Sequence, residues 1–131
     1  MRQGIKSLLG PKLLLGIAIA YTLLVTAALL TPITGAPKIE IPFADKMVHL
    51  IINAGLFVVW ASYVFSGKTK TTKTYTLPLL FVCTLLYGIL IEVVQGSFIP
   101  TRGADFFDVV ANVCGLILGF FAVKLTKKFI Y

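Results

Sequence analysis

Three short groups of polar residues interrupt an otherwise apolar chain, and the first of them has the residue types that chemistry requires. Asp45, His49 and Asn53 follow one another at intervals of four, so they lie on one face of a helix. A histidine beside a carboxylate can transfer protons or contribute to a divalent metal site. Lys46 belongs to the same group and can bind an anion. Asp45 can also stabilise the start of a helix.

The second group contains Glu92 and Gln95, which are three residues apart and therefore share a helical face. A long, almost uncharged segment precedes Glu92. A carboxylate in such a segment costs several kcal/mol inside a membrane unless it is paired, protonated or hydrated. The position of Glu92 therefore indicates either a buried partner or a function.

The third group contains Arg102, Asp105, Asp108 and Asn112. The last three are separated by three and four residues, so they form one helical stripe. Arg102, together with a lysine, can bind a phosphate or carboxylate. Structural alternatives remain open for this group. Asp105 can cap a helix, and Arg102 can form an ion pair with Glu92.

These groups define two sets of candidate site residues. One histidine with no nearby thiol provides too few nitrogen and sulfur ligands for a typical zinc site. We therefore assign no metal ligands and identify no cofactor. A carboxylate or the imidazole can act as a general acid or base. The candidate catalytic residues are His49, Glu92 and Asp108. The candidate ligand-binding residues are Asp45, Lys46, Gln95, Arg102, Asp105 and Asn112.

The elements that position these residues are expected to be membrane-spanning helices. The chain has 131 residues, of which 58% are hydrophobic and 13% charged, a composition that does not suit a soluble domain. A spanning helix needs roughly 20 apolar residues. The sequence predicts an all-α bundle of four transmembrane helices, at about 13–30, 47–65, 75–94 and 106–125, in a single domain over 1–131. Gly96, Pro100 and Gly103 are expected to end the third helix.

Basic residues predict how the helices are oriented. Three precede the first segment, three separate the second from the third, and three lie at or just after the end of the fourth, whereas the other side has only Lys38, Lys46 and Arg102. Because basic residues stay in the cytoplasm, both termini are expected to be cytoplasmic and all five acidic residues to lie on the outer side. The net charge of +7 thus reflects topology and anionic lipid, and nucleic-acid binding is not expected.

Small residues also predict how the helices pack. Ala111, Gly115 and Gly119 are four residues apart, and small residues at this spacing allow close helix contact in lipid. The fourth segment is therefore expected to be central. Cys83 and Cys114 lie inside apolar runs and are expected to be small buried side chains rather than a disulfide or metal pair.

The order and spacing of the polar groups resemble those of the VanZ-like membrane proteins. The resemblance covers residues from about 40 to 122, and the first segment is similar only in being hydrophobic. It implies the bacterial cell envelope, since the family's named member confers teicoplanin resistance, but it implies no particular reaction. The residues that carry it are Asp45-Lys46-x-x-His49, Glu92-x-x-Gln95 and Arg102-x-x-Asp105-x-x-Asp108-x-x-x-Asn112-x-x-Gly115-x-x-x-Gly119.

The leading hypothesis is a multi-pass protein of the bacterial cytoplasmic membrane that binds or modifies an anionic lipid-linked or head-group ligand at the outer leaflet. Glycopeptide antibiotic resistance is the implied setting. The partners would be membrane lipid and a lipid-linked cell-wall precursor or glycopeptide, and an oligomer stays open. The alternatives are a metal-dependent hydrolase or transferase, a small transporter, and a purely structural envelope protein.

Overall fold

A computed structural model describes residues 10–32, 43–66, 75–100 and 103–130, with the side chains of 127–130 outside the description. All regular structure in these ranges is helical, which confirms the predicted all-α fold. The helices are α2 (Pro11–Leu30), α3 (Ala44–Ser66), α4 (Thr76–Phe98) and α5 (Phe106–Ile130). Each contains a window of mean hydropathy between 1.8 and 2.4 and is long enough to cross a bilayer.

Two of the predicted helix ends were wrong. The helix α4 continues through Gly96 to Phe98, whereas Gly96 was expected to break it. In the fold, Gly96 packs so closely against Ala104 that an added Cβ atom would lie 2.6 Å from the Ala104 Cβ. A glycine serves here as a packing position, and this role cannot be read from composition. The helix α5 likewise extends beyond the predicted end at 125, to Ile130.

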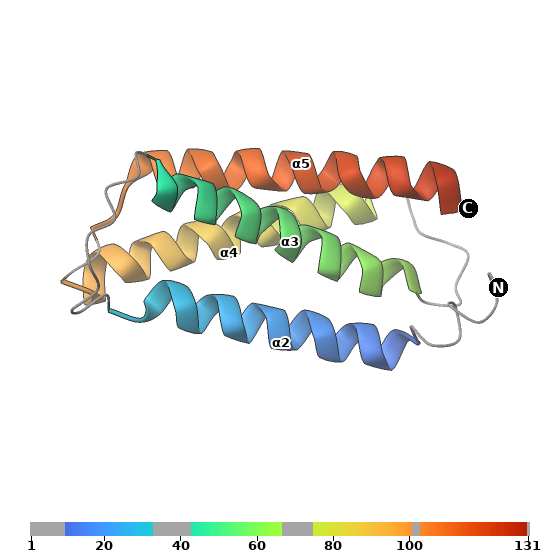
Figure 1. Ribbon diagram of the computed structural model, residues 1–131, viewed down its shortest axis with the longest axis horizontal. Coiled ribbons are helices and arrows are strands. Elements are labelled where there is room, and N and C mark those ends of the chain that lie inside the picture. The colour runs from blue at the N-terminus through green and yellow to red at the C-terminus, as the bar shows by residue number, and fades with distance from the viewer. Residues whose placement is uncertain (1–9, 33–42, 67–74, 101–102, 131) are drawn as a thin grey trace.

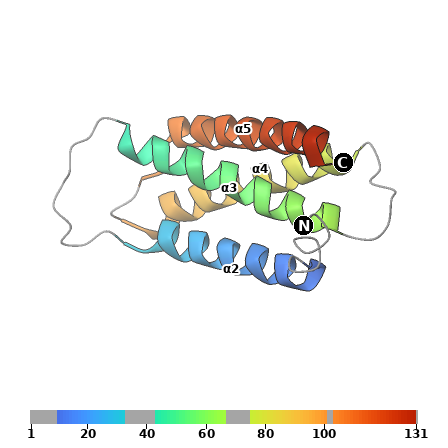
Figure 2. The same ribbon diagram turned by 45° about the vertical axis from the view of Figure 1, so that its right-hand side comes forward.

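The helices run up and down, so that the starts of α3 and α5 lie at the same end of the bundle as the ends of α2 and α4 (Figure 1). The helix α3 packs most extensively against α5, and α2 packs against α3 and α4. Figure 2 shows α5 and α2 on opposite sides of the α3–α4 pair. The expectation that the fourth segment is central was therefore wrong, because α3 contacts all three other helices whereas α5 contacts only α3 and α4. This connectivity brings three segments that are distant in sequence, near residues 45, 92 and 105, to one end of the molecule.

Apolar side chains cover the outside of the bundle, as expected of a protein whose solvent is lipid. Large apolar residues are exposed along the helices, including Leu24, Leu86 and Leu118, which are 69%, 60% and 54% exposed. The interior, in contrast, contains a high share of polar groups. The buried polar residues are His49, Asn53, Thr84, Glu92, Gln95, Asp108 and Asn112.

The predicted small-residue seam is confirmed on the face of α5 that contacts α3. Ala111 is 8% exposed. A Cβ atom added at Gly115 would collide with the carbonyl group of Leu50, and one added at Gly119 would lie 2.9 Å from the carbonyl oxygen of Ala54. The two backbones approach this closely because no side chain separates them.

The prediction that both cysteines are buried was wrong. Cys83 and Cys114 are free and exposed, which places them on the lipid-facing side of α4 and α5. In a soluble protein an apolar run indicates the interior. In a bilayer, apolar residues are equally suited to face lipid, and the interior is selected by polarity and small size.

Interhelical hydrogen bonds attach α2 to the rest of the bundle. The Tyr21 hydroxyl donates to the carbonyl oxygen of Ile52 on α3 over 2.9 Å. The hydroxyls of Thr26 and Tyr87 on α4 are 2.6 Å apart. Hydrogen bonds of this kind stabilise membrane bundles by about 0.6 to 2 kcal/mol each, so α2 is held by polar contacts as well as by packing.

The seam between α3 and α5 generates a stability prediction. Gly115→Ala places a methyl group against the Leu50 backbone, and we expect it to lower the free energy of unfolding by about 1 to 3 kcal/mol through overpacking. The measurement is an SDS titration of bicelle-reconstituted protein followed by circular dichroism. Gly16→Ala is the matched control, because no atom lies within 4 Å of an added Cβ there. Equal midpoints for the two variants would contradict the close packing.

Candidate functional site

The polar side chains at the shared end of the bundle, some buried and some exposed, form one contiguous group, here called the polar cluster, with His49 at its centre. The first turns of α3 and α5 and the last turns of α4 supply its members. His49 itself is 1% exposed. The polar cluster consists of Asp45, Lys46, His49, Asn53, Glu92, Asp105, Asp108 and Asn112.

His49 faces acidic or amide groups on both sides of its ring. Its Nδ1 atom lies 3.1 Å from Asn112 Oδ1 and 3.4 Å from Glu92 Oε1. Its Nε2 atom lies 3.8 Å from Asp108 Oδ2 and 3.9 Å from Asp45 Oδ1. All three predicted catalytic residues, His49, Glu92 and Asp108, are therefore brought together, although they come from three helices.

An asparagine pair determines which nitrogen of His49 carries the proton. Asn53 Nδ2 donates to the backbone carbonyl of His49 over 2.9 Å and to Asn112 Oδ1 over 2.7 Å. Because Asn112 Oδ1 acts as an acceptor, His49 Nδ1 is the donor in the 3.1 Å contact. The Nε2 atom of the neutral ring is then the basic nitrogen, and it faces the carboxylates of Asp45 and Asp108.

Glu92 is buried without a hydrogen bond. The residue is 3% exposed, and neither carboxylate oxygen has a hydrogen-bond partner in the part of the chain that the structure describes. Asn53 Oδ1 is unsatisfied in the same sense. An unpaired buried carboxylate is costly. The polar cluster is therefore suited to receive a further proton, cation or hydrogen-bond donor.

Lys46 is held by two aspartates. Its Nζ atom lies 2.9 Å from Asp105 Oδ2 and 3.2 Å from Asp108 Oδ1. The hydrogen bond from Lys46, helped by the backbone N–H of Phe107, holds the pKa of the Asp105 carboxyl below its ordinary value. The 2.8 Å bond from Phe107 N to Asp105 Oδ1 also shows that Asp105 caps α5. Lys46 is thus engaged in ion pairs in this structure.

Two of the predicted ligand-binding residues are not placed in the polar cluster. Gln95 is buried, but its Nε2 atom donates to the carbonyl oxygen of Leu29 over 2.6 Å, so its side chain links α4 to the end of α2. Arg102 lies outside the described residues. The remaining predicted ligand-binding residues, Asp45, Lys46, Asp105 and Asn112, do meet His49 or its neighbours.

Two residues of the site were not assigned by sequence reasoning. Asn53 was recognised on the stripe of His49 but received no role, and the structure makes it a bridge between α3 and α5. Gly88 leaves the space that the amides occupy, because an added Cβ atom would lie 3.2 Å from Asn112 Nδ2. A glycine inside the apolar segment of α4 is the only signal the sequence offers for this position.

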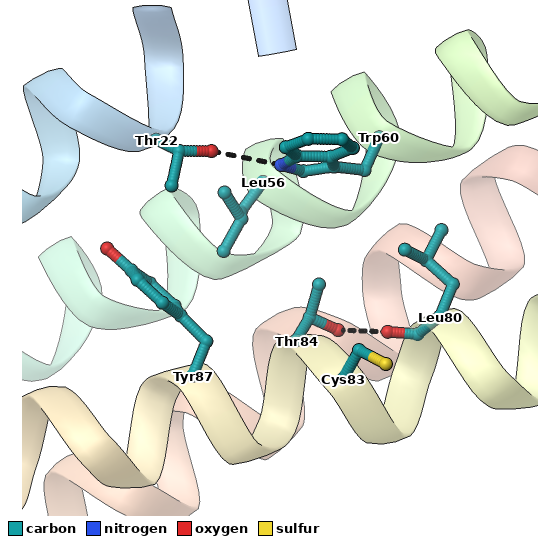
Figure 3. Close-up of a pocket in the computed structure, with 7 residues that line it drawn as sticks. All are labelled: Thr22, Leu56, Trp60, Leu80, Cys83, Thr84 and Tyr87. Atoms are coloured by element: carbon teal, nitrogen blue, oxygen red, sulfur yellow. Dashed lines mark hydrogen bonds between the residues drawn. The ribbon is translucent and has the colours of Figure 1, made fainter. Parts of the chain in front are cut away.

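An apolar cavity of about 290 Å³ lies between α2, α3 and α4, further along the bundle from the polar cluster. Figure 3 shows side chains from the three helices around it, with the Trp60 indole N–H donating to the Thr22 hydroxyl over 2.9 Å. Cys83, one of its lining residues, is exposed, so the cavity borders the lipid-facing surface. Its lining residues are Thr22, Leu56, Trp60, Leu80, Cys83, Thr84 and Tyr87.

The fold and the site together define a multi-pass helical membrane protein with a polar site buried at one end of its bundle. The chain matches the VanZ/LLP1 family over residues 15–127, and it belongs to that family. This confirms the resemblance inferred from the polar motifs and extends it into α2.

The chain is also 34% identical over 83 residues to an uncharacterized protein of the fission yeast Schizosaccharomyces pombe. The match covers 63% of this chain and 48% of the relative, so the chain spans about half the length of this curated relative. No solved structure shows significant similarity to the chain. Because the relative is eukaryotic, a bacterial origin and a link to teicoplanin stay predictions.

The amide bridge generates a prediction about the integrity of the site. Asn112→Ala removes the acceptor for both Asn53 Nδ2 and His49 Nδ1. We expect the free energy of unfolding to fall by about 1 to 2 kcal/mol, measured by SDS titration in bicelles. Ser62→Ala is the control, since that exposed hydroxyl bonds only to a carbonyl of its own helix. A loss no greater than that of Ser62→Ala would show that the bridge is not formed.

Proposed function

We propose that the protein binds an anionic, lipid-linked or head-group ligand with its polar cluster at the outer leaflet of the bacterial cytoplasmic membrane. The positions of nine basic residues on one side of the four segments support this orientation, with both termini in the cytoplasm. The observation that carries the proposal is the combination of a polar cluster at one end of the bundle with an apolar cavity further along it, which suits a ligand that has both a head group and a hydrocarbon chain.

The apolar cavity supports a ligand that has a hydrocarbon chain. Leu56 follows His49 by seven residues, and Thr84 precedes Glu92 by eight, so the cavity lies roughly 10 to 12 Å along the helices from the polar cluster. A lipid whose head group occupies the polar cluster would extend its chain in this direction. The lining is almost entirely apolar, as a hydrocarbon chain requires.

The charge of the site restricts how an anion would bind. The described part of the cluster has four carboxylates, on Asp45, Glu92, Asp105 and Asp108, and a single lysine that already pairs with two of them. Further positive charge is needed for an anionic head group. Arg102, which precedes Gly103 directly in the sequence, is the residue we assign to this role, since a guanidinium can bind a phosphate through two parallel hydrogen bonds.

Acid–base chemistry on the bound head group is a second candidate function. It is favoured by the arrangement of His49, whose Nε2 atom faces Asp108 while Nδ1 faces Glu92. A histidine in such a position can accept a proton at Nε2 while a hydrogen bond at Nδ1 keeps the ring in place. Release of phosphate or of a new lipid from the ligand, lost in His49→Gln, would identify this activity.

Ligand binding can be tested directly with polyprenyl phosphate and, as the matched ligand, the uncharged polyprenol. We expect the purified protein to bind the phosphate more tightly than the alcohol, and Arg102→Ala to weaken phosphate binding by about tenfold, which corresponds to about 1.4 kcal/mol. Native mass spectrometry of detergent complexes is the measurement. Lys124→Ala is the control, because Lys124 lies near the opposite end of α5. Equal binding by Arg102→Ala and Lys124→Ala would refute the proposal.

The link to glycopeptide resistance has its own test. We expect expression of the wild-type chain in a susceptible bacterium to raise the minimum inhibitory concentration of teicoplanin, and Glu92→Gln to abolish the increase, because the variant removes the carboxyl group that faces His49. Immunoblots of membrane fractions must show equal amounts of the two proteins. An unchanged inhibitory concentration with the wild-type chain would argue against this role.

A further inference from the structure

We propose that the polar cluster is a binding site for a divalent transition-metal cation, with Asp45, His49 and Asp108 as its ligands and Glu92 beside them. This inference refines the function proposed above and rests on it only for the role of the metal, because the geometry of the site stands by itself. In the sequence alone, a histidine beside a carboxylate is compatible with a divalent metal site, but one histidine was too few for ligands to be assigned.

The three side chains offer their ligand atoms to a common point. One ligand atom from each of Asp45, His49 and Asp108 lies within 4.8 Å of the other two. The separations of His49 Nε2 from the two aspartates, 3.8 and 3.9 Å, are too long for hydrogen bonds. They suit atoms that share one cation at metal–ligand distances of about 2.0 to 2.6 Å.

A cation would also remove an electrostatic conflict. The basic Nε2 lone pair of His49 faces two carboxylates, and these carboxylates lie near each other. Lys46 neutralises one side of Asp108 through Oδ1, whereas Oδ2 is the atom that faces His49. Apart from the imidazole itself, none of the described side chains places a positive charge on the side where the three ligand atoms converge.

Glu92 provides the independent observation that points to a ligand. It is 3% exposed, its Oε1 atom lies 3.4 Å from His49 Nδ1, and neither of its oxygens has a hydrogen-bond partner among the described residues. A carboxylate buried in this manner needs a counter-charge close by. A divalent cation bound at Nε2 would polarise the Nδ1–H group on the opposite side of the ring, which is the side that Glu92 faces.

The second nitrogen of His49 is held as it is in metal sites. A histidine that binds a metal through one ring nitrogen almost always donates its other N–H to an oxygen acceptor, which fixes the tautomer. Asn112 Oδ1 fills this role at 3.1 Å from Nδ1, and Asn53 holds Asn112 in place. The ring is therefore positioned with Nε2 directed at the two aspartates.

The ligand set selects the class of cation. One imidazole and two carboxylates combine a nitrogen ligand, which Mg²⁺ and Ca²⁺ rarely use, with oxygen ligands that favour Mn²⁺ over soft metals. Mn²⁺ and Zn²⁺ are the probes we select. Three protein ligands also leave coordination positions open, so the cation could hold the phosphate of the proposed ligand against an acidic site.

The test is metal binding by the purified full chain in detergent after removal of metals with EDTA. We expect one Mn²⁺ per chain by elemental analysis, and a ¹⁴N signal from one imidazole in pulsed electron paramagnetic resonance. His49→Gln should abolish the ¹⁴N signal, and Asp45→Asn should raise the Kd by about tenfold or more. Cys114→Ser is the control, because Cys114 is a free and exposed side chain outside the ligand set, and this variant should keep the wild-type Kd within about twofold.

The outcomes separate this proposal from the proposed function. Failure of the wild-type chain to bind Mn²⁺ or Zn²⁺ at one per chain would overturn it, as would a wild-type Kd in Asp45→Asn. The Asp45 side chain is 64% exposed, so this variant is expected to fold even if His49→Gln does not. Polyprenyl phosphate binding that persists in EDTA would also count against the metal while leaving the binding function intact. Metal binding without polyprenyl phosphate binding would support the metal site and count against the proposed binding function.

Discussion

The close approach of α3 and α5 is the contact on which the rest of the structure depends. Without side chains at Gly115 and Gly119, the two backbones meet at Leu50 and Ala54. One to two turns closer to the polar end, the same approach brings His49 within hydrogen-bond distance of Asn112. Because lipid offers no hydrogen-bond partners, the polar groups of both helices are directed into this contact. Helix packing and site assembly are therefore two results of one seam.

The polar cluster is held by hydrogen bonds on the Nδ1 side of His49, whereas on the Nε2 side the polar atoms face one another without hydrogen bonds. The amides of Asn53 and Asn112 fix the His49 ring from the Nδ1 side, and Lys46 holds Asp105 and one oxygen of Asp108. The remaining oxygens and the Nε2 atom converge without a positive charge between them. Buried polar atoms that lack hydrogen-bond partners, next to side chains that are held in place, are characteristic of a binding site. In a purely structural network, the polar groups would be hydrogen-bonded to one another.

The chain belongs to the VanZ/LLP1 family, and part of it is similar to an uncharacterized fission yeast protein. Neither finding says what the polar cluster binds. The chemistry of such a site is set by its own contacts, and a shared family does not determine it.

The sequence by itself determined the helices, the small-residue seam and the membership of most of the site. Hydropathy identified each span to within a few residues at most ends, and intervals of three and four placed Asp108 with Asn112 and His49 with Asn53, because helical periodicity is local. Only the tertiary structure decided what those faces meet. It directed Gln95 to Leu29 rather than to His49, turned both cysteines toward lipid, and brought Asp45, His49 and Asp108 together as a ligand set. These outcomes depend on how helices distant in sequence pack against each other. They could not be predicted from residue type, because an apolar residue can face lipid or protein and a polar residue can bond to any of several partners.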